Sequence, residues 1–372
     1  MLAEHLDYVS DALRLDRFRQ AIAARLRPGD RVADLGCGTG VLGLLCLQAG
    51  AAHVHAIDDS PMLDVARRAF DVAGHAAHVS LYRGSCESTT LPEKVDLAIA
   101  DHVGYFGIDY GILSLFRDAR ARLLRPGGLL IPSRLRLLVA LAGSPRCAAL
   151  ARGEAAGPLV PEFRWMRDLA ANTRHPVTLA ADELLGAPSM LGELELGADG
   201  PELLRWTAVL QAHRDGCVNG MAGWFEADLA PGVTMTNSPL APDAIRRPHA
   251  LFPIGEGVAV RSGDEVRIVL LARPDDHLLR WQVEFPASGR RFSHSTWEGE
   301  AFDAVRLARI RPDRAPRLAA LGRARLALLA ACDGRRSIGE LQADFVRDHG
   351  ALFPTAAAAA RFAAQVLDVN TE

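Results

Sequence analysis

The chain has 372 residues, of which 49% are hydrophobic and 23% charged, and this ordinary globular composition excludes a largely disordered or fibrous protein. Its 42 lysines and arginines nearly balance its 45 aspartates and glutamates. The net charge of −3 therefore gives no electrostatic reason to expect nucleic acid or an anionic membrane as a partner. At about 150 residues per domain, the length predicts two or three domains.

Cysteine usage and hydropathy indicate the compartment. The cysteines show no C-x-x-C or C-x-x-H spacing, which argues against a disulfide framework and against a zinc site; they are Cys37, Cys46, Cys86, Cys147, Cys217 and Cys332. The first residues, MLAEHLDYVSDALRLDRF, are amphipathic and acidic and lack the apolar run of a signal peptide. No segment offers the about 20 uncharged apolar residues of a membrane span. We expect a cytoplasmic protein that holds no metal and contacts no membrane.

The first third of the chain alternates between strand-like and helix-like segments. Residues 1–28 carry apolar side chains at helical spacing and end at a Pro-Gly-Asp turn. From there to Pro132 the pattern predicts strands at 31–36, 53–58, 79–83, 95–100 and 128–132 and helices at 40–49, 61–74 and 111–124. Strands that alternate with helices form a parallel, doubly wound sheet with both faces covered. We therefore predict an α/β Rossmann-like domain over residues 1–133.

The pattern changes after Pro132. Strand-like segments are joined by stretches rich in glycine and proline; these segments are 135–142, 232–239, 257–272 and 278–285. Such a pattern is typical of an antiparallel sheet or β-barrel, which we assign to residues 134–300. Residues 150–180 are rich in Arg and Ala with weak helical character, and we expect them to leave the barrel as an arm.

Residues 305–372 predict a third, small helical domain. One Ala-, Leu- and Arg-rich helix is expected over 305–331, followed by two more helical stretches. Ser337 and Glu340 fit the capping box of the second helix. The expected core consists of Leu341, Phe345, Phe353, Phe362 and Val366.

The most informative stretch is VADLGCGTG at residues 32–40. A predicted strand runs into three alternating glycines, which allow a tight turn and the close approach of a ligand to the backbone. The next strand ends at Asp58, about 20 residues on, where an acid holds ribose hydroxyls. Together these features resemble the S-adenosyl-L-methionine (AdoMet) site of class I methyltransferases, although a glycine turn in an unrelated α/β protein is the alternative. The cofactor-binding residues implied here are Asp34, Gly36, Cys37, Gly38, Gly40 and Asp58.

Neighbouring segments resemble one subfamily, the protein arginine methyltransferases. The pattern H-x5-D-x2-R before the turn is similar to the family's N-terminal helix, and other matching segments follow in order up to about residue 290. These segments are RGSCESTTL, PEKVDLAIAD (92–101), RPGGLLIPSRLRL (125–137) and NGMAGWFEADLAPGVTMTNSP (219–239).

The resemblance implies roles for residues at the cofactor. Arg14 grips the methionine carboxylate and caps the bound AdoMet, and His5 lies in the same N-terminal motif. Glu87 falls where the family's glutamate meets the adenine amino group, accompanied by the backbone of Cys86. AdoMet is thus the expected cofactor and S-adenosyl-L-homocysteine (AdoHcy) the expected product.

The acceptor loop departs from the family. Two glutamates there bracket a G-Y loop and hold the acceptor guanidinium by paired charge-assisted hydrogen bonds. Here Asp101 occupies the first position, Gly104 and Tyr105 are kept, and the second position aligns with Tyr110, one residue after Asp109. A shorter carboxylate arm displaces a guanidinium by about 1 Å, which is costly in rate. The acceptor therefore sits deeper or is not a guanidinium.

Candidate catalytic residues follow from this loop. Asp101 and Asp109 are expected to orient an N–H acceptor and accept its proton, with Tyr105 nearby, and His102 is an alternative base because imidazole titrates near neutrality. The family's later T-H-W element falls in IRRPHALF (245–252), where Arg246 aligns with its histidine. We keep His249, three residues further on, as a further candidate. Each of these residues has a purely structural role as its alternative.

Two segments predict partners. Residues 150–180 occupy the place of the family's dimerisation arm, so Trp165 and Met166 are expected at a homodimer interface rather than packed on their own barrel. The C-terminal domain resembles the small winged-helix domains related to the PQQ-biosynthesis peptide chaperone. Those domains bind leader segments of ribosomally made precursor peptides by adding a strand. A helical stability cap or part of the dimer interface is the alternative.

Three functions follow. The first is an AdoMet-dependent N-methyltransferase acting on a side-chain nitrogen of a peptide, a ribosomally made natural-product precursor held by the C-terminal domain. The second is the same enzyme acting on a free amino acid or small molecule such as arginine. The third is a non-catalytic partner-binding protein on a methyltransferase scaffold, against which the complete cofactor motif argues.

Overall fold

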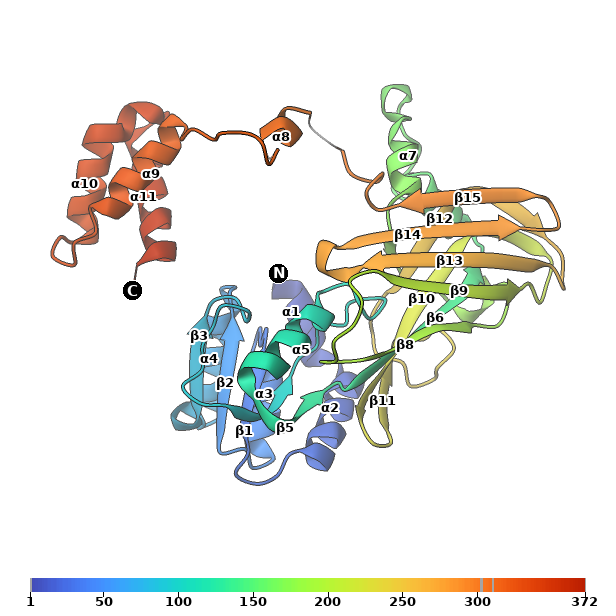
Figure 1. Ribbon diagram of the computed structural model, residues 1–372, viewed down its shortest axis with the longest axis horizontal. Coiled ribbons are helices and arrows are strands. Elements are labelled where there is room, and N and C mark those ends of the chain that lie inside the picture. Colours follow the sequence, from blue (N-terminus) through green and yellow to red (C-terminus); the bar gives the residue numbers. More distant parts are fainter. Residues whose placement is uncertain (1, 302–303, 310, 372) are drawn as a thin grey trace. The chain divides into compact units, whose positions relative to one another are not determined.

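The computed structural model describes residues 2–301, 304–309 and 311–371, which divide into two compact units, residues 1–301 and 302–372 (Figure 1). The predicted Rossmann-like and antiparallel regions both lie in the first unit. The predicted C-terminal domain falls in the second unit.

The first unit begins with two helices and a parallel sheet. The helices are α1 (Leu2–Ser10) and α2 (Ala12–Arg25). The sheet has the order β3-β2-β1-β4-β5, and all its pairs are parallel. Its strands are β1 (Arg31–Leu35), β2 (His53–Asp58), β3 (Val79–Arg83), β4 (Val95–Ile99) and β5 (Leu124–Ile131). This architecture confirms the predicted Rossmann-like fold, with each strand close to its predicted range.

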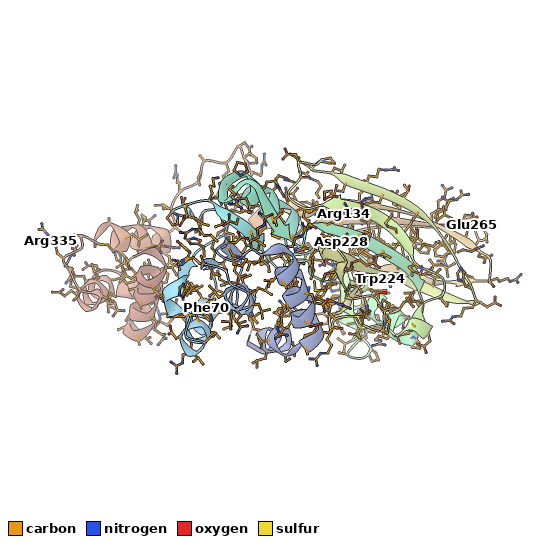
Figure 2. The ribbon with its side chains drawn as sticks, turned by 90° about the horizontal axis from the view of Figure 1, so that it is seen from below. Phe70, Arg134, Trp224, Asp228, Glu265 and Arg335 are labelled. Atoms are coloured by element: carbon orange, nitrogen blue, oxygen red, sulfur yellow. The ribbon has the colours of Figure 1, made fainter. Side chains whose placement is uncertain are left out.

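Helices cover the parallel sheet, as the amphipathic segments predicted (Figure 1). They are α3 (Val41–Gln48), α4 (Met62–Val72) and α5 (Ile112–Asp118), and α5 continues as a π-helical turn over Ala119–Leu123. The central strands are apolar and buried because helices pack on both faces of the sheet. Phe70 of α4 is fully buried in this core, and Figure 2 shows it among the side chains of the parallel part.

Two antiparallel sheets make up the rest of the first unit. One runs β7-β12-β10-β6-β8, with β11 paired to β10, and the other runs β15-β14-β13-β9. Their strands are β6 (Arg134–Ala142), β7 (His175–Val177), β8 (Ser189–Glu195), β9 (Leu204–Gln211), β10 (Gly216–Ala230), β11 (Val233–Thr236), β12 (His249–Val260), β13 (Glu265–Arg273), β14 (Leu278–Phe285) and β15 (Arg290–Ser295). One apolar core draws side chains from both sheets. The predicted antiparallel arrangement is therefore present.

Several strands differ from their predicted extents. The segment 257–272 is two strands, β12 and β13, separated by the turn around Gly263. The long strand β10 is buried along most of its length, including Trp224, and lacks the alternation of polar and apolar residues that marks a half-buried strand. The arm between β6 and β7 holds α6 (Pro145–Ala151) and α7 (Met166–Ala171), in agreement with weak helical character.

The second unit is built from helices. They are α8 (Ala304–Arg309), α9 (Ala320–Ala330), α10 (Ile338–His349) and α11 (Ala356–Asn370). The single helix predicted over 305–331 is wrong: residues 311–319 are not helical, because Pro312 and Pro316 each remove a backbone donor.

The core of the second unit contains the predicted side chains. Leu341, Phe345 and Val366 are buried, and Phe353 and Phe362 pack against them. The rings of Phe345 and Phe362 stack with centroids 5.7 Å apart. The predicted capping box is present, since the Ser337 and Glu340 side chains each accept the other's backbone N–H. Within the described residues of this unit there is no strand, so the winged-helix resemblance stays a prediction.

Across the described ranges 2–301, 304–309 and 311–371, no helix combines the length and apolar character needed to cross a bilayer.

Candidate functional site

The glycine turn forms one wall of a cleft at the carboxyl end of β1. Gly36, Gly38 and Gly40 have φ values of 62°, 53° and 75°, which residues with a side chain rarely adopt. A Cβ on Gly36 would lie 2.1 Å from Cε1 of His102, and one on Gly38 would lie 2.8 Å from Cε1 of His5. The two histidine rings thus press on bare backbone, and only glycine fits at these positions.

Two carboxylates hold the turn. Oδ2 of Asp58 accepts the Gly38 N–H at 2.7 Å, while its Oδ1 accepts both the backbone N–H and the hydroxyl of Ser60. Asp34 accepts the Gly43 N–H at 2.8 Å and so joins the end of β1 to the first turn of α3. Burial raises the pKa of Asp34 to about 7, with a smaller contribution from Asp58.

The cleft contains two adjoining cavities of about 260 and 540 Å³. Both are lined by Gly36, Asp58, Asp59, His102 and Tyr110. The smaller cavity is also lined by His5, Arg14, Cys37 and Gly38, and the larger one by Cys86 and Glu87. The structure therefore gathers eight of the ten predicted cofactor residues around one cleft, while Asp34 and Gly40 shape the turn from behind.

A buried ion cluster closes one end of the cleft. Asp101 follows β4, and its side chain is only 8% exposed. Its Oδ2 accepts Nε of Arg14 at 2.6 Å and Nη2 of Arg247 at 2.8 Å, and its Oδ1 accepts Nη1 of Arg247 at 3.0 Å. The ring of Tyr8 lies 5.4 Å from both guanidinium carbons.

The cluster also bears on the ionisation of Asp101. The guanidinium groups of Arg247 and Arg14 outweigh the effect of burial and hold the pKa of Asp101 well below its usual range. A carboxylate that stays ionised under three charge-assisted hydrogen bonds is a poor proton acceptor at neutral pH. Asp101 is thus engaged by two arginines, and its role as a proton acceptor stays a prediction.

Asp11 and Asn237 position the cluster. Asp11 caps α2 by accepting the Arg14 N–H at 3.2 Å, and it also accepts the Arg246 N–H at 3.0 Å. Asn237 donates to the carbonyls of Tyr105 and Pro248 at 2.9 and 2.7 Å. These bonds tie the N-terminal helix and the acceptor loop to the segment that carries Arg247.

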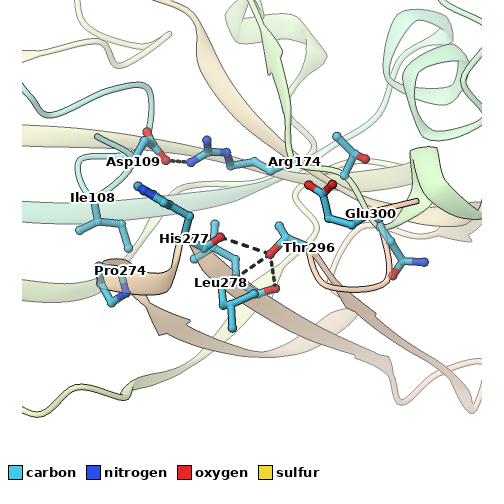
Figure 3. Close-up of a pocket in the computed structure, with 12 residues that line it drawn as sticks. Ile108, Asp109, Arg174, Pro274, His277, Leu278, Thr296 and Glu300 are labelled. Carbon is cyan, nitrogen blue, oxygen red and sulfur yellow. Dashed lines mark hydrogen bonds and ion pairs between the residues drawn. The ribbon is translucent and has the colours of Figure 1, made fainter. Parts of the chain in front are cut away.

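Asp109 is held by contacts within the acceptor loop and by an arginine. Its Oδ2 accepts the backbone N–H groups of Tyr105 and Phe106, each at 2.5 Å, and its Oδ1 forms an ion pair with Arg174 (Figure 3). The side chain is fully buried. Burial lowers the pKa of Arg174 to about 10, so its guanidinium remains charged at neutral pH. Asp109 thus locks the acceptor loop and presents no free carboxylate.

A third cavity of about 290 Å³ lies beside this pair, between the acceptor loop and the antiparallel sheets (Figure 3). Pro274 and His277 in the turn between β13 and β14 line both this cavity and the larger cofactor cavity. His277 has a φ of 54°, which is uncommon for a residue with a side chain.

The two histidine candidates, His102 and His249, differ in their surroundings. His102 lines both cofactor cavities, and its shielded Nδ1 has no hydrogen-bond partner among the described residues. Burial lowers its pKa below the usual 6.5, so the ring is neutral at pH 7. His249 instead accepts the Leu179 N–H at 3.1 Å and joins β12 to the residues after β7. His102 faces the cleft and His249 joins two strands, and the role of each as a base stays a prediction.

Tyr105 serves the loop mainly through its backbone, and its ring contacts that of Tyr110 at 5.9 Å. Tyr110 is 39% exposed and lines both cofactor cavities, so at the second acidic position the cleft receives a phenol and not a carboxylate.

Sequence reasoning missed Arg247, Arg174 and Asn237. Arg247 lies in IRRPHALF beside Arg246, and Asn237 lies inside the T-x-S-P element, so both belonged to matched segments. Only their contacts with residues more than 100 positions away reveal their roles. Over the described parts of the chain, no group of His, Cys, Asp and Glu side chains is arranged to bind a metal ion.

Comparison with known proteins identifies a methyltransferase domain over residues 32–128. A probable protein arginine N-methyltransferase 6 of Arabidopsis thaliana is 35% identical over 143 residues, which are 38% of this chain and 33% of that relative. The protein arginine N-methyltransferase 1 of Dictyostelium discoideum is 35% identical over 138 residues, 36% of this chain and 40% of the relative. The chain thus spans well under half the length of these two relatives.

A longer match is an arginine N(omega)-methyltransferase of Streptomyces achromogenes subsp. streptozoticus, 27% identical over 277 residues, which cover 72% of this chain and 75% of that protein. Among solved structures, Arabidopsis thaliana protein arginine methyltransferase 10 superposes with a TM-score of 0.68 at 21% identity, covering 80% of this chain and 98% of that one. The Trypanosoma brucei PRMT1 enzyme–prozyme complex with AdoHcy gives a TM-score of 0.70 at 19% identity, covering 79% and 98%.

These findings confirm the predicted resemblance to protein arginine methyltransferases and a methyltransferase domain over residues 32–128. The two solved structures share the fold of about four-fifths of this chain.

Replacing Asp58 by alanine should weaken AdoMet binding by about 30-fold or more, because the turn loses its Gly38 bond and the cleft loses a buried carboxylate. Calorimetric titration of AdoMet measures this change. Asp64→Ala is the matched control, since Asp64 is an exposed acid paired with Arg83 outside the cleft. Equal affinities for wild type and Asp58→Ala would show that Asp58 does not form the cofactor site.

Proposed function

We propose that the chain is an AdoMet-dependent N-methyltransferase whose acceptor is a side-chain nitrogen of a peptide, a ribosomally made natural-product precursor held by the C-terminal unit. The observation that carries this proposal is the neutral, unpartnered His102 beside the glycine turn, in a cleft built from the expected cofactor residues. AdoMet supplies, when bound, a methyl group activated on a sulfonium.

The residues present fit AdoMet. The glycine turn offers bare backbone, and Asp58 and Glu87 place carboxylates in the cleft. Arg14 lines the cleft with its guanidinium, the group that suits the methionine carboxylate. Asp58 and Glu87 would hold the ribose hydroxyls and the adenine amino group.

His102 accepts the proton that the acceptor nitrogen gives up. Its imidazole is neutral above pH 6.5, and a base must be unprotonated before it can work. The two aspartates of the acceptor loop do not compete for this role, because Asp101 and Asp109 are held by protein arginines. The same pairing leaves no free carboxylate pair for a guanidinium, which favours another side-chain nitrogen.

The Streptomyces relative supports a second candidate. That relative is an arginine N(omega)-methyltransferase, and the match covers 72% of this chain. A methyltransferase for a free amino acid such as arginine would use the same cofactor cleft, with the third cavity beside Asp109 and Arg174 as room for the acceptor. In that case the C-terminal unit is a stability element.

The proposal extends to the antiparallel sheets and to assembly. The two sheets would act as the barrel on which the acceptor rests, and two chains would form a homodimer through the arm. Support for the dimer comes from exposed apolar side chains on the arm, since Phe163, Trp165 and Met166 are 51%, 58% and 38% exposed.

The pH dependence of turnover tests His102. Because burial lowers the pKa of His102 below its usual 6.5, kcat should be near its plateau at pH 8 and fall at acidic pH as the ring takes up a proton. His102→Asn should lower kcat about 100-fold and remove this acid limb. An unchanged acid limb in the variant would assign the titration to another group.

Acceptor choice is tested with labelled AdoMet and peptides containing lysine, histidine or arginine, beside free arginine. Precursor-like peptides should be methylated by wild type. Phe345→Ala, which removes the central ring of the second unit, should raise KM for the peptide at least 10-fold and leave cofactor affinity unchanged. Leu326→Ala, an exposed position on α9, is the control.

Transfer to free arginine alone, unaffected by Phe345→Ala, would replace the peptide proposal by the second candidate. No transfer to any acceptor by a protein that binds AdoMet would favour the non-catalytic scaffold.

A further inference from the structure

We propose that Arg247 is a positioning residue for the cofactor: by holding Asp101, it aims the Arg14 guanidinium at the methionine carboxylate. This inference rests on the proposed function, and it assigns a task to a residue outside the predicted site.

The contacts run in sequence from the cleft inward. Arg14 lines the cofactor cavity with Gly36, Gly38 and Asp58. Its Nε donates to Asp101 at 2.6 Å and its Nη1 to the Tyr8 carbonyl at 3.1 Å. Its Nη2 forms no hydrogen bond with the described residues, and the side chain as a whole is only 4% exposed. Two of the three nitrogens are thus committed to the protein, and the third is left for a ligand.

Arg247 stands on the other side of Asp101. It donates to both carboxylate oxygens at 2.8 and 3.0 Å in the forked geometry of a guanidinium–carboxylate pair. Its side chain is 5% exposed and lines neither cofactor cavity. Arg247 therefore reaches the cleft through its partners, the hydrogen-bonded Asp101 and the ring of Tyr8.

The need for a second arginine follows from competition between carboxylates. Without Arg247, the buried Asp101 would have Arg14 as its sole charged partner and would draw the whole guanidinium toward itself. The methionine carboxylate would then have to compete with Asp101 for the same fork. Because Arg247 donates to both oxygens of Asp101, Arg14 needs to donate only its Nε–H to the aspartate. A terminal nitrogen of Arg14 then stays available to the cofactor.

Arg247 is itself held rigidly. The preceding residue, Arg246, donates its backbone N–H to Asp11, the residue that caps the helix carrying Arg14. The next residue, Pro248, is held through its carbonyl by Asn237. Both guanidinium groups lie against the ring of Tyr8. Arg14 and Arg247 are thus placed by shared contacts, as a positioning function requires.

Two ligands separate this role from general support of the fold. AdoHcy carries the carboxylate, and S-adenosyl-3-thiopropylamine is the same molecule without it. Their dissociation constants are measured by calorimetry on the full chain, as wild type, Arg247→Met and Arg247→Lys. Arg136→Met is the matched control, because Arg136 forms ion pairs with three carboxylates outside the cleft, those of Glu193, Glu226 and Asp228.

Arg247→Met should weaken AdoHcy binding about 10- to 100-fold and change binding of the decarboxylated ligand less than twofold. Arg247→Lys, which keeps the charge without the fork, should show a smaller loss of at least threefold, confined to AdoHcy. Arg136→Met should match wild type for both ligands.

Equal weakening of both ligands by Arg247→Met would overturn the proposal, since Arg247 would then support the whole site. Unchanged AdoHcy binding would also overturn it. If Arg247→Met does not fold, Arg247→Lys provides the test. The quantity compared is the ratio of the dissociation constants of the decarboxylated ligand and AdoHcy, and a ratio in Arg247→Lys equal to that of wild type would reject the role. Failure of wild type to bind either ligand would instead contradict the proposed function.

Discussion

The site depends on the need of one buried carboxylate, that of Asp101, for oppositely charged partners. Asp101 lies at the end of β4 with almost no solvent access, and a buried charge without a partner is costly. Two arginines from distant parts of the chain meet it, one from α2 and one from the segment before β12. Removing one partner from such a cluster costs about 3–5 kcal/mol. The ion cluster therefore fastens the N-terminal helix and the antiparallel part to the parallel sheet.

The same fastening shapes the chemistry. The residue after Asp101 is His102, whose ring rests on the backbone of Gly36, where any side chain would collide with it. The residue that ends the acceptor loop's turn, Asp109, is bound by its own loop and by Arg174. Two of the three acidic or basic groups in this loop are thus fixed by ion pairs, and the histidine alone keeps an unpartnered nitrogen. The proposed division of positioning and proton transfer between different residues rests on this electrostatic difference.

Sequence patterns predicted the parallel sheet and the cofactor turn because both depend on local order. The alternation of strands and helices along the chain predicts a parallel sheet. The spacing from Asp34 to Asp58 predicts that the glycine turn lies beside the end of the next strand, where Asp58 accepts the Gly38 N–H. The long strand β10 shows no polar alternation because it is covered on both faces, and local periodicity cannot report that. In the second unit, Pro312 and Pro316 separate α8 from α9 despite a composition that favours helix throughout. The roles of Arg247 and Arg174 could not be predicted for a different reason. The role of an arginine depends on the carboxylate with which it pairs, and local sequence does not show that partner.

The central claim is that Arg14 serves the cofactor while Arg247 serves Asp101. A crystal structure of the full chain with AdoHcy tests it most directly. The account predicts the AdoHcy carboxylate within hydrogen-bonding distance of an Arg14 Nη atom, with both Arg247 bonds to Asp101 still formed. A carboxylate bound elsewhere, or an Arg247 that has left Asp101 to reach the cofactor, would contradict it.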